Sequence, residues 1–192
     1  IAPRRLLEEE KQEDPAPGVL VDIDGAGNRL HVYAEGSGEE TLVFLSGFGT
    51  TSPFYDFKPL YERLSEDYRV AVVERAGYGW SDVTSDARDI DTVLEATRSA
   101  LQLAGESGPY VLFPHSMAGL EAAHWAMRYP EEVEASIGLD ALVPTYAHET
   151  ELQPSVSRLI TVLTRTGLIR NQPGVFESNF TAMQKGHLTD EE

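Results

Sequence analysis

A single serine separates an apolar stretch from a helix-forming stretch within Pro109–Leu120. The apolar residues predict a short buried strand, and a helix is expected to follow over Met117–Tyr129. In a nucleophile elbow, usually written Gly-x-Ser-x-Gly, such a sharp strand-to-helix turn carries a serine out above a sheet. Ser116 is therefore a candidate nucleophile for attack on a carbonyl carbon. Because Pro114 and Ala118 stand at the two glycine positions, this stretch alone leaves open an ordinary strand–turn–helix with a capping serine.

Two further loops directly follow stretches that predict buried strands. Residues 46–49 (Ser-Gly-Phe-Gly) follow the continuously apolar Thr41–Leu45, and the glycine-punctuated residues 74–82 follow Arg69–Val73. Strands that alternate with helices predict an α/β fold with a mostly parallel sheet and helices on both faces. Ligands of such folds bind beyond the carboxyl ends of the strands, so both loops and Ser116 are expected to meet at one edge of the sheet.

The other predicted elements complete this arrangement. They are an antiparallel hairpin, two helices and one more strand: Val19–Ile23 with Arg29–Ala34, then Pro59–Leu64, Asp89–Ala104 and Glu134–Leu139. We divide the chain into an N-terminal tail over 1–18, the N-terminal part of the core over 19–146 and a lid segment over 147–192. The lid is expected to cover the sheet edge, since its helical pattern follows the last predicted core strand.

The composition argues against several kinds of partner and site. The 192 residues carry a net charge of −17, which argues against nucleic acid as a partner. The chain has no cysteine, so it offers neither a thiolate nucleophile nor a cysteine-bound metal, and we predict no cofactor and no metal. It also contains no apolar run of about 18 residues that would span a membrane. Because the chain begins at Ile1 rather than Met, we expect that an upstream segment was removed or left out.

Taken together, these motifs resemble those of the α/β-hydrolase superfamily of serine hydrolases. Residues 44–49 are similar to its oxyanion loop, residues 74–81 to Asp-x-Arg-Gly-x-Gly-x-Ser, and residues 115–119 to the elbow Gly-His-Ser-Met-Gly-Gly. Ser46 stands where the oxyanion loop of the family usually has histidine. The resemblance implies the α/β-hydrolase fold with the beginning of a helical lid.

Shorter runs resemble a bacterial subgroup that is anchored by an N-terminal membrane helix. They are residues 45–47, 56–61 and 114–117. This resemblance implies a location at the bacterial cell surface or membrane with the anchor removed; the alternative is the cytoplasm.

The superfamily also implies roles for particular residues. Ser116 would be the nucleophile, and the backbone N–H groups of Phe48 and Met117 would bind the oxyanion. The acid of the triad lies between serine and histidine in chain order, and Asp140 closes the strand after the elbow helix. An acid at this strand is a variant of the fold. The alternatives are an acid one strand later, beyond this chain, and an Asp140 that only makes loop hydrogen bonds.

No histidine of the chain is a convincing general base. His31 is expected on the exposed side of the hairpin, His115 next to the nucleophile and His124 packed on the elbow helix, while His148 and His187 lie in the lid segment. The catalytic histidine of the superfamily follows the last strand. We therefore expect a second chain to carry the C-terminal part of the fold with this histidine, and we expect this chain alone to be inactive.

The resulting hypothesis is a serine hydrolase that cleaves a small-molecule carboxylic ester, or less readily an amide. One alternative is an aminopeptidase of the proline-iminopeptidase kind, which needs acidic groups for the substrate amine, and Glu121, Glu149 and Glu151 are candidates. A second alternative is a non-catalytic binding protein on a hydrolase scaffold.

Overall fold

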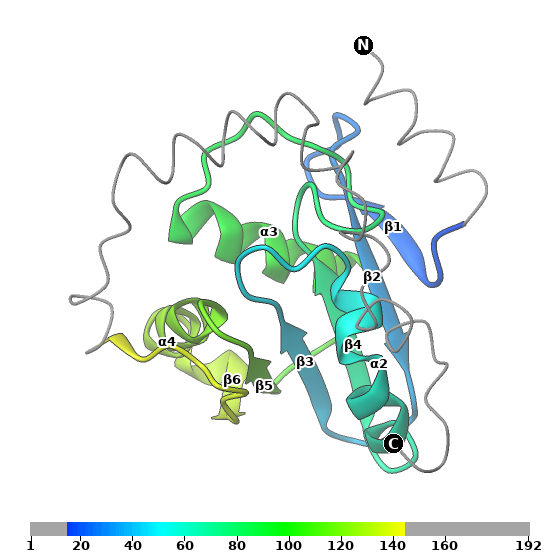
Figure 1. Cartoon of the computed structure of the whole chain (residues 1–192), viewed down its shortest axis with the longest axis vertical. Coiled ribbons are helices and arrows are strands. Elements are labelled where there is room, and N and C mark those ends of the chain that lie inside the picture. Colours follow the sequence, from blue (N-terminus) through cyan, green and yellow to red (C-terminus); the bar gives the residue numbers. More distant parts are fainter. Residues whose placement is uncertain (1–14, 145–192) are drawn as a thin grey trace, which may run out of the picture. The chain divides into compact units, whose positions relative to one another are not determined.

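Six strands form one sheet in the computed structural model, which describes residues 15–144 (Figure 1). The strands are β1 (Val19–Asp22), β2 (Arg29–Glu35), β3 (Thr41–Leu45), β4 (Arg69–Glu74), β5 (Tyr110–Pro114) and β6 (Val133–Ser136), and their spatial order is β1-β2-β4-β3-β5-β6. Strand β2 pairs antiparallel with β1 and β4, whereas β4, β3, β5 and β6 are parallel to one another. The predicted hairpin and mostly parallel sheet are confirmed. The predictions for residues 1–14 and for the lid over 147–192 lie outside the described residues.

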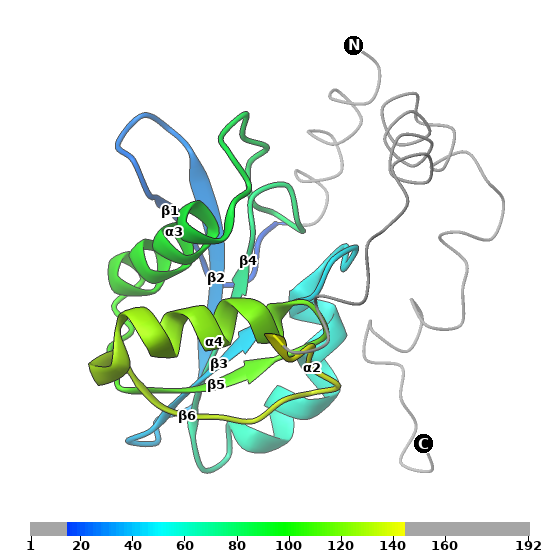
Figure 2. The same ribbon diagram turned by 90° about the vertical axis from the view of Figure 1, so that its left-hand side faces the viewer.

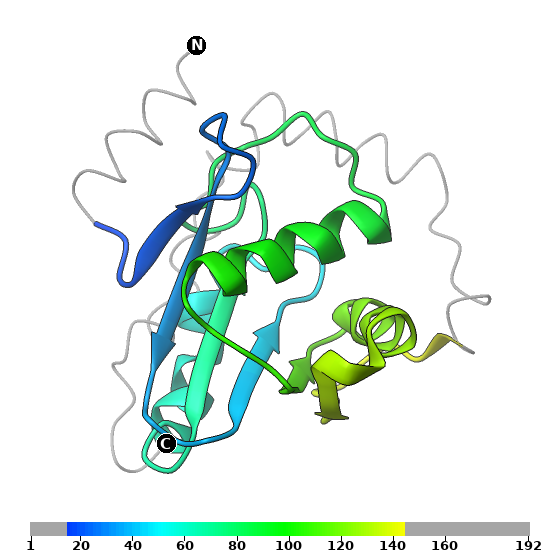
Figure 3. The same cartoon turned by 180° about the vertical axis from the view of Figure 1, so that it is seen from behind.

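Helices cover both faces of this sheet, as the alternating pattern predicts. Helix α2 (Pro53–Leu64) packs on one face, while α3 (Ile90–Leu103) and α4 (Ala118–Arg128) pack on the other; Figure 3 shows α3 in front of the strands. All five residues of β3 are buried, which explains why this central parallel strand is continuously apolar. Within residues 15–144, no helix is both long and apolar enough to cross a bilayer.

Helix α2 begins earlier than the sequence pattern predicts. We expected a helix over Pro59–Leu64, but the helix starts at Pro53. Ser52 takes the extended N-cap conformation and Pro53 the first helical position, where its missing N–H costs nothing. Pro59 lies inside the helix but on its exposed side, where water can bond the carbonyl that a proline leaves without a donor. Pro59, which the sequence pattern predicted near the start of the helix, thus lies in the helix interior.

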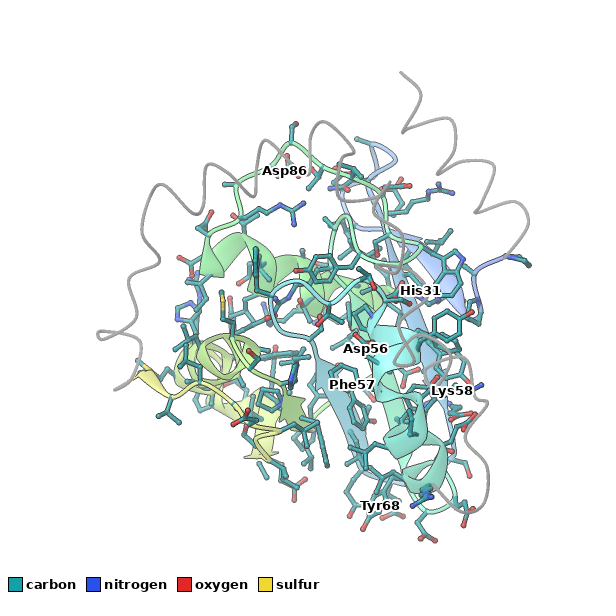
Figure 4. All side chains as sticks on the ribbon, viewed as in Figure 1. His31, Asp56, Phe57, Lys58, Tyr68 and Asp86 are labelled. Atoms are coloured by element: carbon teal, nitrogen blue, oxygen red, sulfur yellow. The ribbon has the colours of Figure 1, made fainter. Side chains whose placement is uncertain are left out.

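The prediction of an exposed His31 is wrong. Its side chain is fully buried, because β2 is covered on both faces and Phe54 and Trp80 pack against the imidazole ring. The ring lies between β2 and the upper part of α2 in Figure 4. Its Nδ1 lies 3.1 Å from a carboxylate oxygen of Glu74, and its Nε2 contacts the Pro17 carbonyl oxygen. A buried polar side chain needs such partners, and these contacts come from residues far away in the sequence.

The elbow helix α4 lies beside α3 (Figure 2), and a polar network ties the two helices together. Arg98 on α3 donates to both oxygens of Glu132, and Trp125 Nε1 on α4 donates to the same carboxylate at 2.8 Å. Hydrogen bonds from Arg98 lower the pKa of Glu132 below its ordinary value. The network therefore fixes α4, the helix that follows Ser116, against α3.

Candidate active site

The turn between β5 and α4 has the geometry of a nucleophile elbow. Ser116 adopts φ 52°, in the left-handed region that residues with a side chain rarely occupy. The turn is closed by hydrogen bonds on both sides: the His115 N–H donates to the Leu45 carbonyl at 2.9 Å and the Ala118 N–H to the His115 carbonyl at 3.0 Å. The Ser116 residue is half-buried, so it is not enclosed in the core. A strained residue held by a regular hydrogen-bond frame is a candidate for function.

The alanine at the second glycine position has a packing explanation. Ala118 is fully buried, so its methyl group fits at the position where the pattern has glycine. The close approach occurs one residue later, because a Cβ on Gly119 would lie only 2.2 Å from the Leu142 carbonyl oxygen. The segment after β6 crosses the start of α4 at this glycine.

The loop after β3 reaches the elbow, as the parallel sheet predicts. A Cβ on Gly47 would lie 2.8 Å from the Ser116 Cβ, so the loop backbone contacts the serine directly. Phe48 and Met117 flank this contact with side chains that are 67% and 45% exposed. Neither the Phe48 nor the Met117 N–H donates a hydrogen bond to another of the residues 15–144. Within residues 15–144, two amide donors without an acceptor thus occur, one residue after Gly47 and one residue after Ser116.

Asp140 lies beside the elbow in a second strained conformation. Ser116 and Asp140 are the two non-glycine residues with positive φ in the described range, and Asp140 has φ 48°. The residues around Asp140 bond the elbow: the Ser116 N–H donates to the Leu139 carbonyl at 3.3 Å, and the Leu142 N–H donates to the Ser116 carbonyl at 2.8 Å. The Asp140 residue is exposed. The fold therefore brings the backbones of the two candidate triad residues together.

None of the described histidines forms a hydrogen bond with the Ser116 or Asp140 side chain. His31 bonds Glu74, and His124 is not simply packed, since its Nε2 lies 2.9 Å from Asp91 Oδ1. His115 precedes the nucleophile and stacks edge-on with Phe57. His148 and His187 are outside the described residues. No histidine between residues 15 and 144 thus holds the position of a general base.

Glu121 is engaged in the core. This carboxylate on the first turn of α4 is buried, pairs with the Arg75 guanidinium and accepts a 3.1 Å hydrogen bond from Thr97 Oγ1. The positive end of the helix dipole also favours a carboxylate there. Glu121 is therefore not available for a substrate amine, and Glu149 and Glu151 lie outside the described residues.

Removal of Arg75 should destabilise the protein strongly. Arg75→Met would leave Glu121 as a buried carboxylate without its cation, and we expect a loss of about 3 kcal/mol in the free energy of unfolding, measured by urea denaturation. Addition of Glu121→Gln should recover part of the loss, because the uncompensated charge disappears. An equal loss in the single and double variants would contradict the role of this ion pair.

Sequence reasoning missed the connections around the loop after β4. Glu74 is fully buried and accepts hydrogen bonds from the Trp80 N–H and from Ser52, and the Tyr78 hydroxyl accepts one from the Gly49 N–H. The one available signal was that Glu74 stands at the aspartate position of the motif. Among residues 15–144, no group of three or more His, Cys, Asp or Glu side chains is placed to hold a metal ion.

Comparison with known proteins gives separate evidence on the fold of this chain. Residues 40–188 match the family described as alpha/beta hydrolase fold. The chain is 45% identical over 179 residues to the uncharacterized protein YbdG of Bacillus subtilis, covering 91% of this chain and 54% of that protein. It is 32% identical over 156 residues to the pimeloyl-[acyl-carrier protein] methyl ester esterase of a Shewanella species, covering 81% of this chain and 54% of the esterase.

A solved structure has a similar fold. The epoxide hydrolase of Bacillus megaterium superposes with a TM-score of 0.63 at 22% identity, over 90% of this chain and 63% of the hydrolase. At this identity the likeness concerns the fold alone. The chain spans about half the length of the curated relatives named above.

Proposed function

This chain belongs to the alpha/beta hydrolase fold family, and we propose that it supplies the nucleophile of a serine hydrolase that cleaves a carboxylic ester. The observation that carries the proposal is the strained Ser116, at φ 52°, in direct contact with the loop that carries the Phe48 N–H, which has no acceptor among residues 15–144. A serine at the elbow also argues against a carboxylate nucleophile of the kind that epoxide hydrolases use. The esterase relative adds support for ester substrates.

The proposed reaction proceeds through an acyl-enzyme. The Ser116 Oγ attacks the ester carbonyl carbon while its proton passes to a histidine, and the resulting oxyanion accepts hydrogen bonds from the Phe48 and Met117 N–H groups. Collapse breaks the bond to the alcohol, which leaves with the proton from the histidine. Water then attacks the acyl-enzyme in the same way and releases the acid and Ser116. In this scheme Asp140 orients the histidine and stabilises its charged form.

The histidine would come from outside this chain, in a second polypeptide with the C-terminal part of the fold. Two observations support this proposal. The described histidines are engaged elsewhere or precede the nucleophile, and β6, the last strand of the described sheet, has three exposed residues out of four although parallel strands are normally covered. The chain alone is then expected to be inactive. The likeness of short runs to membrane-anchored hydrolases stays a prediction.

A fluorophosphonate probe tests the proposed function. The full-length protein, meaning this chain together with the polypeptide that carries the histidine, should be labelled at Ser116, and Ser116→Ala should abolish the labelling. Ser107→Ala is the matched control, because Ser107 is exposed and precedes β5 at the opposite end of the strand. Absence of labelling in the unmodified full-length protein would favour the non-catalytic binding protein instead. The aminopeptidase loses its described acidic candidate, since Glu121 is paired with Arg75.

A further inference from the structure

Within residues 15–144, the side chain of residue 46 does not stabilise the loop that carries Phe48 by a hydrogen bond. Ser46 stands where the resemblance expects histidine, and its side chain is 1% exposed. The Ser46 hydroxyl nevertheless makes no hydrogen bond with any other of the residues 15–144. Since the usual supporting side chain is replaced, other groups must fix the backbone around Phe48.

The loop after β4 makes these contacts. The Gly49 N–H donates to the Tyr78 hydroxyl at 3.2 Å, one residue after Phe48. The Gly79 N–H donates to the Thr51 carbonyl at 2.8 Å. The two loops are therefore joined by hydrogen bonds on either side of residue 50.

Glu74 fixes the far end of the same loop. Its Oε1 accepts hydrogen bonds from Ser52 Oγ at 2.9 Å and from the Phe54 N–H at 3.2 Å, and its Oε2 accepts one from the Trp80 N–H at 2.9 Å. A Cβ on Gly79 would lie 1.8 Å from this carboxylate, so glycine makes room for it. One fully buried side chain thus connects the start of α2, where the Phe48 loop ends, with the loop that carries Tyr78.

We propose that Tyr78 and Glu74 are positioning residues that hold the Phe48 N–H at the oxyanion site and so replace the support missing at Ser46. This inference rests on the proposed function. Tyr78 acts on the amide next to Phe48, and Glu74 acts on the anchor of the whole loop. Oxyanion donors are effective because they are fixed before the reaction, so a loosened loop weakens binding of the transition state more than binding of the ester.

The variant Tyr78→Phe tests this inference in the full-length protein with 4-nitrophenyl butyrate as the substrate. It removes only the hydroxyl that accepts from the Gly49 N–H. We expect kcat to fall by about 10-fold to 100-fold with KM within about twofold, because a small misplacement near the reacting atoms has effects of this size. The affinity for a trifluoromethyl ketone, which forms an oxyanion on Ser116, should fall by the same factor as kcat.

Tyr68→Phe is the matched control. Tyr68 precedes β4 at its amino end, lies near the lower end of α2 in Figure 4, and should leave kcat unchanged when its hydroxyl is removed. Glu74→Gln is the second variant: the amide has one acceptor oxygen fewer, so one of the loop anchors is lost, and kcat should again fall without a change in KM. Thermal unfolding of each variant, followed by circular dichroism, separates loss of folding from loss of positioning.

The outcomes separate the two proposals. If Ser116 is labelled by the fluorophosphonate but a folded Tyr78→Phe keeps the original kcat and ketone affinity, the positioning role is wrong and the proposed function stands. A different result would be that KM rises while kcat falls, and that the ketone affinity weakens only by the factor by which KM rises. This result would indicate a general structural role and overturn the inference. If Ser116 is not labelled at all, the proposed function fails and the inference fails with it.

Discussion

Replacement of Ser116 by alanine is expected to lower kcat of the full-length protein for 4-nitrophenyl butyrate by about 10⁶-fold. The serine oxygen forms the covalent bond to the acyl group, and no neighbouring hydroxyl of the described range takes its place, since the Ser46 hydroxyl is buried. The fold should be preserved, because the turn is held by backbone hydrogen bonds that alanine keeps. Steady-state kinetics and circular dichroism give the two readings.

The left-handed backbone at residue 116 is the feature that could change the stability of the Ser116→Ala variant. Alanine accepts φ 52° with a small strain that serine already bears, so stability should change by less than about 1 kcal/mol. Ser107→Ala should match the unmodified protein in both readings. A Ser116→Ala protein that keeps even a hundredth of the original kcat would contradict a covalent role for Ser116.

The second large effect is expected for Asp140→Asn, which should lower kcat by about 10⁴-fold with little change in KM. An amide in place of the acid of a triad favours the wrong tautomer of the histidine and does not stabilise its charged form. Asparagine is suited to the site because it accepts left-handed conformations, such as φ 48°, more readily than most residues. The loss should therefore come from the charge and not from the backbone.

Asp86→Asn is the control for Asp140→Asn. Asp86 is an exposed aspartate before α3, labelled in Figure 4, and its carboxylate accepts a hydrogen bond from Asn28. This variant should keep the original kcat. If Asp140→Asn also keeps kcat within about twofold, then the acid lies beyond this chain and Asp140 serves only the loop that closes the elbow.

The relatives limit what can be transferred to this chain. The similarity to a methyl ester esterase extends over 54% of that enzyme, so about half of its length has no counterpart here. In the proposed reaction the nucleophile and oxyanion donors belong to this chain, and we propose that the histidine comes from a second polypeptide. A recombinant second chain that restores fluorophosphonate labelling of Ser116 would support this division, and labelling of this chain alone would contradict it.

The sequence by itself determined the local parts of this fold. Continuous apolar runs specified the central strands β3, β4 and β5, and the glycine-rich stretches after them specified loops at one edge of the sheet. Ser116 was a candidate from its place after a predicted strand, and the resemblance to the α/β-hydrolase superfamily implied the candidate role of Asp140, which also follows a predicted strand. The boundaries were weaker, as α2 shows, because a proline at residue 59 resembles a helix start as well as it fits an exposed helix interior.

Only the tertiary structure decided which distant residues touch. His31 and Glu74 are 43 positions apart, and Gly49 and Tyr78 are 29 apart, yet each pair is joined by a hydrogen bond. The contact of Gly119 with the Leu142 backbone likewise explains a glycine that is one position late in the motif. Periodicity reports which side of one element is apolar, whereas these contacts depend on how several elements pack together, and that information is not local in the chain.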